Sequence, residues 1–388
     1  MRKAYYSTRY GRYGDSTERN PKIVIAVVVA AVVIAAGVAA AVFWKPSKES
    51  TSVEYVAPLN PSLMDAWLQA NESEAYIAWE PFVSSAVVAG TGKVLEWTSE
   101  IMPHHPCCVV VASNAFISGT DGPVLTLRFV KAHAEATAWA NNALANPDGP
   151  DFRILVNISA DFTKRSPAVV EEAFKHLEYG FEMNASFKEA LTDFTDMYLE
   201  TGYITNQTFH DAGYSTPEQF VDEYVNESYL DGIGGVTPSG SILNPTKAIR
   251  LGYLTGDLHQ VAQAVARNKT AFGGQSMFEK YGLNVTPAAV QGYGNGGLEM
   301  TAFLEGAVDI GYLGAPPAIL NKINKAADTV IVAQANSEGS GIVVGVNSHI
   351  ESLEDLRGHI VATPGETSIQ HLLLRVALER LDIPLVKA

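Results

Sequence analysis

The chain ends on Leu372–Ala388, "LLLRVALERLDIPLVKA", and this stretch decides how the fold must be assembled. Leu372 to Leu381 has the apolar spacing of an amphipathic helix, and Asp382 to Pro384 is typical of a turn. Leu385 to Ala388 then begins a strand at the point where the chain stops. The domain that this strand belongs to must therefore be completed by another part of the sequence.

Strands and helices alternate along most of the chain, which predicts an α/β fold with parallel-rich sheets covered on both faces. Strands are expected near residues 53–56, 75–79, 94–97, 107–112, 249–253, 308–312, 330–334, 342–346 and 359–362. A helical block is expected over residues 124–144, 167–177, 187–201 and 217–225. Between the block and the later strands lies "DGIGGVTPSGSILNPT", Asp231–Thr246, whose glycine, serine and proline content indicates a linker.

The N-terminal part is predicted to cross a membrane. Ile23–Trp44 is free of charge, and 22 helical residues at about 1.5 Å each span roughly 33 Å, enough for a bilayer core. Residues 1–22 are basic, so they are expected in the cytoplasm, with everything after the anchor outside the cell membrane. The length favours an uncleaved anchor, although small residues at Ala39–Ala41 would also suit cleavage.

Charge and cysteine content exclude two classes of protein. The chain carries 42 acidic and 27 basic residues, and because residues 1–22 are basic, the part beyond the anchor is strongly acidic. Nucleic acid is therefore not expected as a partner. The two cysteines, Cys107 and Cys108, are adjacent and cannot join distant segments, so a disulfide scaffold is excluded. Seven Asn-x-Ser/Thr sequons would suit a glycosylated outer surface.

Three strand-to-helix turns carry the polar residues of a possible binding site. They are "GYLTGDLHQVAQAVA" (252–266), "GYLGAPPAIL" (311–320) and "ATPGETSIQHLLL" (362–374). Asp257 with Gln260, and Thr367 with Gln370, have the spacing of capping pairs. Such turns lie at the carboxyl ends of parallel strands, where helix N-termini favour an anion. Each turn alone is more often an ordinary helix cap, and only the three together favour a site.

Other candidate residues lie in the first half of the chain. In "AWEPF" (78–82), Trp79 would stack on an organic ligand and Glu80 would pair with a cationic or donor group, unless both are simply packed. "PHHPCC" (103–108) offers possible metal ligands, but neighbours in a strand point to opposite faces, so no metal site is expected. His105 is expected to line a pocket. No P-loop, dinucleotide fingerprint or nucleophile elbow is present, so no cofactor and no catalytic residue is assigned.

Taken together, four stretches resemble the nitrate/sulfonate/taurine group of ABC-importer substrate-binding proteins, which is similar to the thiamine-pyrimidine-precursor binders. The stretches are residues 249–260, 292–318, 361–379, and 75–82 with 105–108. The resemblance implies a two-lobed type II periplasmic-binding-protein fold that closes over a small ligand and delivers it to a membrane permease. It covers residues from about 53 to 230 and from 246 to 388.

The order of these stretches departs from the family pattern, in which the "GYL" stretch comes first and "WEP" follows the "TPG" helix. The resemblance therefore implies a circular permutation, in which Ser52 onward continues the strand begun at Leu385. The small lobe would comprise residues 52–98 and 350–388, the large lobe residues 101–230 and 247–348, and residues 231–246 would join the family's usual termini. Strands near Val343 and Cys108 would form the hinge. Alternatively, the two halves pair between neighbouring molecules, or one half comes from a gene fusion.

Carried over by residue, the resemblance implies an anionic or polar ligand held by backbone N–H groups and hydroxyls. The ligand-binding residues would be Thr255, Gly256, Asp257, His259, Gly314 and Ala315 from the large lobe, Gly365, Glu366, Thr367, Ser368, Trp79 and Glu80 from the small lobe, and His105. The expected function is a membrane-anchored solute-binding protein and not an enzyme. The alternatives are a pyrimidine-precursor binder, an enzyme on the same fold using His105 with Cys107 or Cys108, and a surface protein without a transport role.

Overall fold

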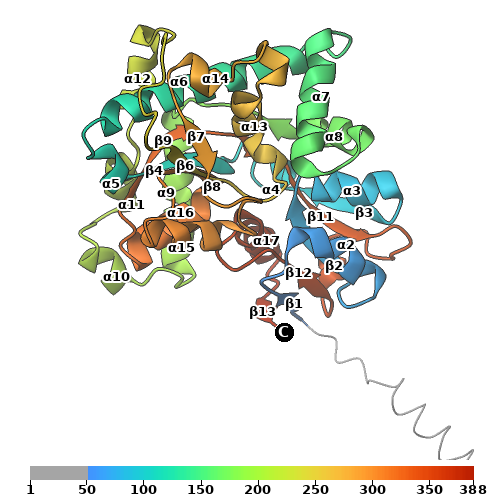
Figure 1. Cartoon of the computed structure of the whole chain (residues 1–388). Coiled ribbons are helices and arrows are strands. Elements are labelled where there is room, and N and C mark those ends of the chain that lie inside the picture. The colour runs from blue at the N-terminus through green and yellow to red at the C-terminus, as the bar shows by residue number, and fades with distance from the viewer. Residues whose placement is uncertain (1–50) are drawn as a thin grey trace, which may run out of the picture. The chain divides into compact units, whose positions relative to one another are not determined.

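Residues 51–388 are the part of the chain that the structure, a computed structural model, describes (Figure 1). The predicted cytoplasmic tail, residues 1–22, and the predicted anchor, residues 23–44, lie outside the described residues. Within residues 51–388, none of the helices combines the length and the apolar character that crossing a membrane requires. These residues form one compact unit built around two large sheets, with a third sheet of only two strands.

The first sheet joins the two ends of the described chain. Its order is β13 (Leu385–Lys387), β1 (Val53–Val56), β12 (Ile360–Ala362), β2 (Ala75–Trp79), β11 (Ser340–Gly345) and β3 (Gly92–Trp97). The first four strands are parallel, and β11 runs antiparallel to both its neighbours. The expected continuation of the C-terminal strand takes a different form: β13 and β1 lie side by side, with Val53 opposite Leu385.

The second sheet has the order β7 (Val285–Pro287), β6 (Ile249–Gly252), β8 (Ile310–Gly314), β4 (Cys108–Ser113) and β9 (Thr329–Gln334). β6 is parallel to β7 and β8, whereas β4 is antiparallel to β8 and β9. Every residue of β8, "IGYLG", is buried, as expected for a strand covered on both faces. The mixed α/β architecture with parallel-rich sheets agrees with the predicted fold class.

Two segments connect the sheets. One runs from β3 through α4 (Thr98–Ile101) to β4, and the other runs from β9 through β10 (Ser337–Glu338) to β11. β10 pairs with β5 (Leu177–Glu178). The predicted large-lobe range 247–348 includes β11, but β11 pairs with β2 and β3 of the six-stranded sheet, because the chain crosses between the sheets before residue 340.

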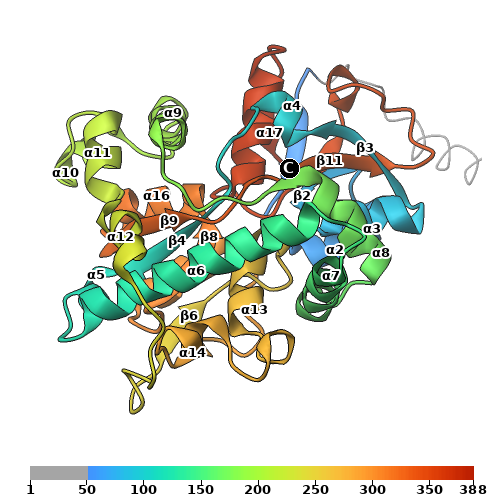
Figure 2. The same cartoon turned by 90° about the horizontal axis from the view of Figure 1, so that it is seen from above.

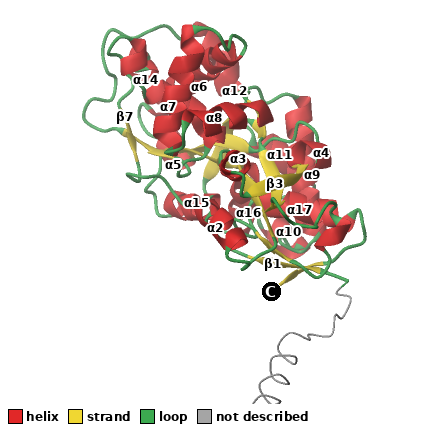
Figure 3. Ribbon diagram, turned by 90° about the vertical axis from the view of Figure 1, so that its right-hand side faces the viewer, coloured by secondary structure: helices red, strands yellow, loops and turns green. Residues whose placement is uncertain are grey.

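Helices cover the strands on both sides, as Figure 3 shows. α6 (Gly122–Leu144) runs along one face of the five-stranded sheet, and α16 (Ala315–Asn324) lies near β8 and β4 on the other (Figure 2). The other helices that bear on the site are α3 (Phe82–Ala89), α7 (Pro150–Thr163), α8 (Pro167–Ala173), α13 (Val261–Arg267), α15 (Gly296–Leu304) and α17 (Ile369–Glu379). The remaining helices are α2 (Pro61–Gln69), α5 (Asn114–Ile117), α9 (Ala185–Glu200), α10 (Asn206–Asp211), α11 (Pro217–Tyr224), α12 (Ser228–Gly232) and α14 (Met277–Lys280).

Candidate functional site

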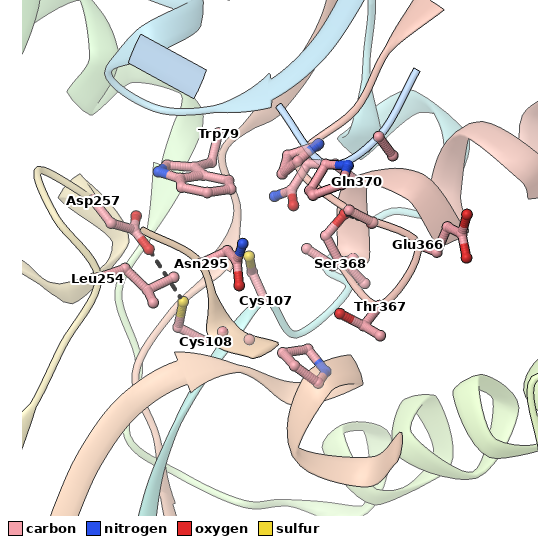
Figure 4. A pocket seen from close by; sticks show the side chains of 18 of the residues that line it. Trp79, Cys107, Cys108, Leu254, Asp257, Asn295, Glu366, Thr367, Ser368 and Gln370 are labelled. Carbon is pink, nitrogen blue, oxygen red and sulfur yellow. Dashed lines mark hydrogen bonds between the residues drawn. The ribbon is translucent and has the colours of Figure 1, made fainter. Parts of the chain in front are cut away.

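A cavity of about 330 Å³ lies where residues from both sheets come together (Figure 4). This volume is within the range of small-molecule sites. Its walls include the ends of β2 and β8, the start of β4, and the turns that precede α15 and α17. Strand ends and helix N-termini thus surround the same space.

Eight of the residues predicted to bind ligand line this cavity. They are Trp79, Asp257, His259, Gly314, Gly365, Glu366, Thr367 and Ser368. Trp79 is 4% exposed, and its indole N–H has no hydrogen-bond partner among residues 51–388. A buried donor without a partner is uncommon in folded proteins, and this N–H lacks an acceptor that the described residues supply.

Thr255 and Gly256 lie outside the cavity, in a separate groove beside α7 and α13. Gly256 has a positive φ of 65°, which turns the chain between Thr255 and Asp257. The Thr255 hydroxyl donates to the carbonyl oxygen of Gln291 at 2.7 Å, and the Asp257 carboxylate faces the cavity. Neighbouring residues of one predicted turn therefore face different spaces.

Three further predicted residues are buried in the surrounding structure. Ala315 is fully buried and its N–H donates to the carbonyl oxygen of Cys107 at 2.8 Å. The Glu80 carboxylate accepts the N–H and the hydroxyl of Ser84, at 2.9 and 2.6 Å. Burial raises the pKa of Glu80 to about 7, although the hydrogen bonds with Ser84 lower it. His105 Nε2 lies 3.0 Å from Thr98 Oγ1, and burial lowers the pKa of His105 to about 4.

The turn before α17 differs in detail from its predicted capping pair. Ser368, rather than Thr367, is the N-cap, and its hydroxyl oxygen accepts the N–H of His371. Gln370 donates to Ser340 Oγ at 2.9 Å. The Thr367 side chain is therefore free to line the cavity, where Figure 4 shows it near Ser368.

Asp257 is confirmed as an N-cap, of a short 3₁₀ turn that precedes α13, but Gln260 does not complete the predicted capping box, because its Oε1 accepts the N–H of Leu254. Asp257 Oδ1 accepts the N–H of His259 at 3.0 Å, and Gln260 Nε2 donates to Asp257 Oδ2 at 3.0 Å. Burial raises the pKa of Asp257 to about 7. The cap fixes the positions of a carboxylate and an imidazole at the cavity wall.

Both cysteines line the cavity, which the list of predicted ligand-binding residues missed. Cys107 Sγ lies 3.1 Å from His259 Nδ1, and Cys108 Sγ lies 3.7 Å from Asp257 Oδ2. Burial raises the pKa of the Cys107 thiol, but its hydrogen bond with Cys108 and the charge of His259 outweigh this and hold it below its usual range. Burial lowers the pKa of His259, but the charges of Cys107 and Asp257 bring it above its usual range.

Cys107 and Cys108 lie close together, although alternation along a strand would direct neighbouring side chains to opposite faces. The ligand atoms of Cys107, Cys108 and His259 all lie within 4.8 Å of one another. Strand alternation does not apply to this pair, because β4 begins at Cys108 and Cys107 precedes the ladder. The adjacent cysteines were the signal that could have placed them in the site.

A second missed contribution comes from α15. Asn295 is its N-cap, accepting the N–H of Leu298 at 3.0 Å, and both Asn295 and Gly296 line the cavity. A Cβ added to Gly297 would lie 3.5 Å from Thr367 Oγ1, so the N-terminus of α15 and the turn before α17 approach each other. "GNGG" at 294–297 follows the same loop-to-helix pattern as the predicted turns and was the available signal.

The family model of NMT1-like proteins matches residues 23–148 and 244–385. The chain belongs to the NMT1-like family. This membership supports a solute-binding protein of the ABC-transporter type. No curated protein and no solved structure matches the chain.

The NMT1-like match leaves out residues 149–243, which include α7 to α12. This unmatched segment contacts the part of the molecule that holds the six-stranded sheet. The Arg165 guanidinium lies 5.1 Å from the Phe82 ring centroid, His176 stacks on Trp97 with centroids 3.7 Å apart, and Tyr203 Oη lies 3.1 Å from His371 Nε2.

Proposed function

We propose that this NMT1-like protein is the solute-binding component of an ABC importer and that it binds a small anionic or polar organic solute in the cavity. The observation that carries the proposal is the buried, unpartnered indole N–H of Trp79 on the wall of a cavity that also meets two helix N-termini. Both features offer hydrogen-bond donors to an acceptor-rich ligand.

The two helices favour an anion for a general reason. The first N–H groups of an α-helix lack intrahelical partners, and the helix dipole adds a partial positive charge there. α15 and α17 have nine and eleven residues, and Asn295, Gly296, Thr367 and Ser368 at their N-termini line the cavity. An oxyanion such as a nitrate, a sulfonate or the sulfonate of taurine suits this arrangement.

The carboxylates of the cavity wall favour an additional donor on the solute. Asp257 lines the cavity, as does Glu366, whose Oε1 accepts Lys387 Nζ at 2.8 Å and the Tyr55 hydroxyl at 2.9 Å. A solute that carries both an anionic and an amino group would satisfy the helix ends and one carboxylate together. Amino-sulfonates therefore rank before simple sulfonates among the proposed solutes.

We also propose the location and the chain order that the sequence indicates. Residues 23–44 would anchor the protein in the cell membrane, with residues 1–22 in the cytoplasm and the cavity on the outer side, close to an ABC permease. A circular permutation is supported by the parallel pairing of β1 with β13, because it brings the two ends of the described chain into one sheet.

Calorimetric titration with nitrate, bicarbonate, methanesulfonate, taurine and pyrimidines tests the solute proposal. For the solute that binds, Trp79→Phe should weaken binding roughly 5- to 150-fold, since losing one donor to a buried acceptor costs about 1–3 kcal/mol. Thr367→Ala should weaken binding to a lesser degree.

Thr255→Ala is the matched control, because the Thr255 hydroxyl is bonded to Gln291 and lies outside the cavity. It should leave the affinity unchanged. Absence of binding by every compound in the panel, or equal effects of Thr255→Ala and Thr367→Ala, would contradict the proposed site.

A second candidate, an enzyme on the same fold, is favoured by one observation, the 3.1 Å contact between Cys107 Sγ and His259 Nδ1. A thiol beside an imidazole is the arrangement of an activated nucleophile. The sequence-based hypothesis paired the cysteines with His105, whereas the structure places His259 there. Product formation from a bound solute that is lost in Cys107→Ser would support the enzyme, and unchanged solute would support the binding protein.

A further inference from the structure

Four side chains that could ligate a metal ion converge on one wall of the cavity. Cys107, Cys108 and His259 offer atoms within 4.8 Å of one another, and Asp257 Oδ1 lies 3.7 Å from His259 Nδ1. All four residues are at most 2% exposed. Figure 4 shows Asp257 and Cys108 side by side, joined by their contact of 3.7 Å. From this geometry we propose that Cys107, Cys108, His259 and Asp257 form a binding site for a borderline-soft divalent cation of the Zn²⁺ type.

Three of the observed spacings are close to those of tetrahedral coordination. With Zn–S near 2.3 Å and Zn–N and Zn–O near 2.0–2.2 Å, a tetrahedron needs about 3.6 Å between sulfur and either nitrogen or oxygen, and about 3.4 Å between nitrogen and oxygen. Here Cys107 Sγ lies 3.1 Å from His259 Nδ1, and Cys108 Sγ lies 3.7 Å from Asp257 Oδ2. His259 Nδ1 lies 3.7 Å from the other carboxylate oxygen, Asp257 Oδ1. The Asp257 carboxylate would have to rotate so that one of its oxygens completes the site beside both neighbours.

The imidazole is already oriented as a ligand. His259 Nε2 donates to the carbonyl oxygen of Gly339 at 2.7 Å, which directs Nδ1 toward Cys107. Metal-bound histidines commonly donate their second N–H to a backbone carbonyl or a carboxylate in this way. A Cβ on Gly339 would lie 2.5 Å from His259 Nε2, so a glycine is required for this approach.

A hydrogen bond from a neighbouring side chain also fixes the position of the Asp257 carboxylate. Gln260 Nε2 donates to Asp257 Oδ2 at 3.0 Å and lies 3.6 Å from Cys108 Sγ, so one amide supports two of the proposed ligands. Two thiolates, one imidazole and one carboxylate form a donor set suited to Zn²⁺ and unsuited to Ca²⁺ or Mg²⁺, which prefer oxygen ligands. The donor types and their supporting contacts therefore both favour a cation of the Zn²⁺ type.

A second group, His104 with Glu178 and Glu338, also brings three ligand atoms within 4.8 Å, but His104 and Glu178 are exposed. Glu338 Oε1 already accepts the backbone N–H of His104 at 2.7 Å, and exposed acidic groups commonly cluster without an ion. This group supplies the control for the experiment.

The test uses the full chain in detergent micelles, reduced and stripped of metal, with Zn²⁺ and Co²⁺ as probes. Competition against a chromophoric chelator should give one Zn²⁺ per chain, and Co²⁺ should give a thiolate-to-metal charge-transfer band with the d–d spectrum of a tetrahedral site. Cys107→Ser, Cys108→Ser and His259→Gln should each abolish the charge-transfer band or weaken binding severely. Gln260→Met should weaken binding roughly 10- to 100-fold, as expected for a residue that supports a ligand.

His104→Gln should bind Zn²⁺ as the wild-type chain does. If a ligand variant does not fold, titrating the wild-type thiols with an organomercurial should still release one equivalent of Zn²⁺. The proposal is overturned by binding of much less than one equivalent, by a Co²⁺ spectrum without charge transfer, or by binding that survives the double cysteine substitution. The Zn²⁺ titration is carried out without solute, so it tests the cation site alone. Titrating the solute with and without Zn²⁺ tests the proposed solute site separately, so failure of one proposal can be distinguished from failure of the other.

Discussion

Glu299 is the basis of the first prediction, because its carboxyl group is fully buried in the second sheet. A Cβ on Gly252 or Gly311 would lie 2.3 or 2.2 Å from Glu299 Oε1, so the carboxyl group occupies the space above these two glycines of β6 and β8. Neither carboxyl oxygen makes a hydrogen bond of normal geometry with another residue of 51–388. Burial, and the charge of Asp257, raise the pKa of Glu299 well above its usual range, although the backbone N–H of Tyr312 lowers it.

The sign of the pH effect follows from proton binding. Above pH 4.5 the unfolded chain ionises Glu299 while the folded protein keeps it protonated, so unfolding releases a proton and stability falls as the pH rises. One full proton corresponds to about 1.4 kcal/mol per pH unit, which is the steepest fall in the free energy of unfolding that this group can cause as the pH rises above 4.5.

Glu299→Gln removes this titration while keeping the size of the side chain. Urea unfolding of residues 51–388 at pH 5, 6 and 7 should show the variant gaining stability on the wild type as the pH rises, by up to about 1.4 kcal/mol per pH unit. Burying the amide of Gln adds a cost to the free energy of unfolding that does not vary with pH. The quantity to compare is therefore the slope of the free energy of unfolding against pH. Glu305→Gln is the control, since Glu305 is exposed beside the C-terminus of the same helix. Parallel pH profiles of the wild type and Glu299→Gln would refute a protonated Glu299 in the folded protein.

Three further predictions concern the cavity wall and the core. Gly339→Ala should destabilise the protein by roughly 1–3 kcal/mol in urea unfolding, because φ is 81° and the Cβ would lie 2.3 Å from Leu177 Cδ2. Gly345→Ala is the control and should not destabilise the protein, because a Cβ at Gly345 would meet open space. Ser368→Ala removes the cap of α17 and should cost about 1 kcal/mol, whereas an equal cost in Thr367→Ala would contradict the assigned cap. His133 donates from Nε2 to the Gln334 carbonyl oxygen and accepts the Tyr312 hydroxyl at Nδ1, and burial lowers its pKa to about 4. Nitrogen-15 NMR should therefore find it neutral from pH 7 to 5, and an imidazolium at pH 5.5 would exclude this network.

Several strands could be predicted from the sequence because most of their residues are buried and apolar. The expected strand at 75–79 coincides with β2, and those near 249–253 and 330–334 differ from β6 and β9 by one residue at one end. Helix α7 was not expected, since "PDFRILVNISADFT" mixes β-branched and polar residues that have weak helix propensity, and its packing against α6 and α13 supplies the missing stabilisation.

The site was less predictable because its geometry depends on tertiary contacts. The spacing of residues in the sequence located the turns but did not tell which residues of a turn face the cavity. Thr255 and Asp257 belong to one turn, yet only Asp257 lines the cavity. His259 was expected at the cavity from the resemblance, but its contact with Cys107 joins residues 152 positions apart and leaves no local pattern. Glu80 was expected to pair with a ligand. Ser84, one helical turn later, instead donates its hydroxyl to the Glu80 carboxylate, and this contact could not be predicted from the sequence.

The residues outside the family match bear on how the cavity would open. If the two sheets separate about the two connecting segments, the contacts of Arg165 with Phe82, His176 with Trp97 and Tyr203 with His371 must also break or move with one side. Ring and cation–π contacts of this kind contribute about 0.5–1.5 kcal/mol each, so together they favour the closed arrangement by a few kcal/mol. The proposed solute would then supply less of the free energy of closure from its own binding, so more of the binding free energy from the proposed donors at Trp79, α15 and α17 would appear as affinity.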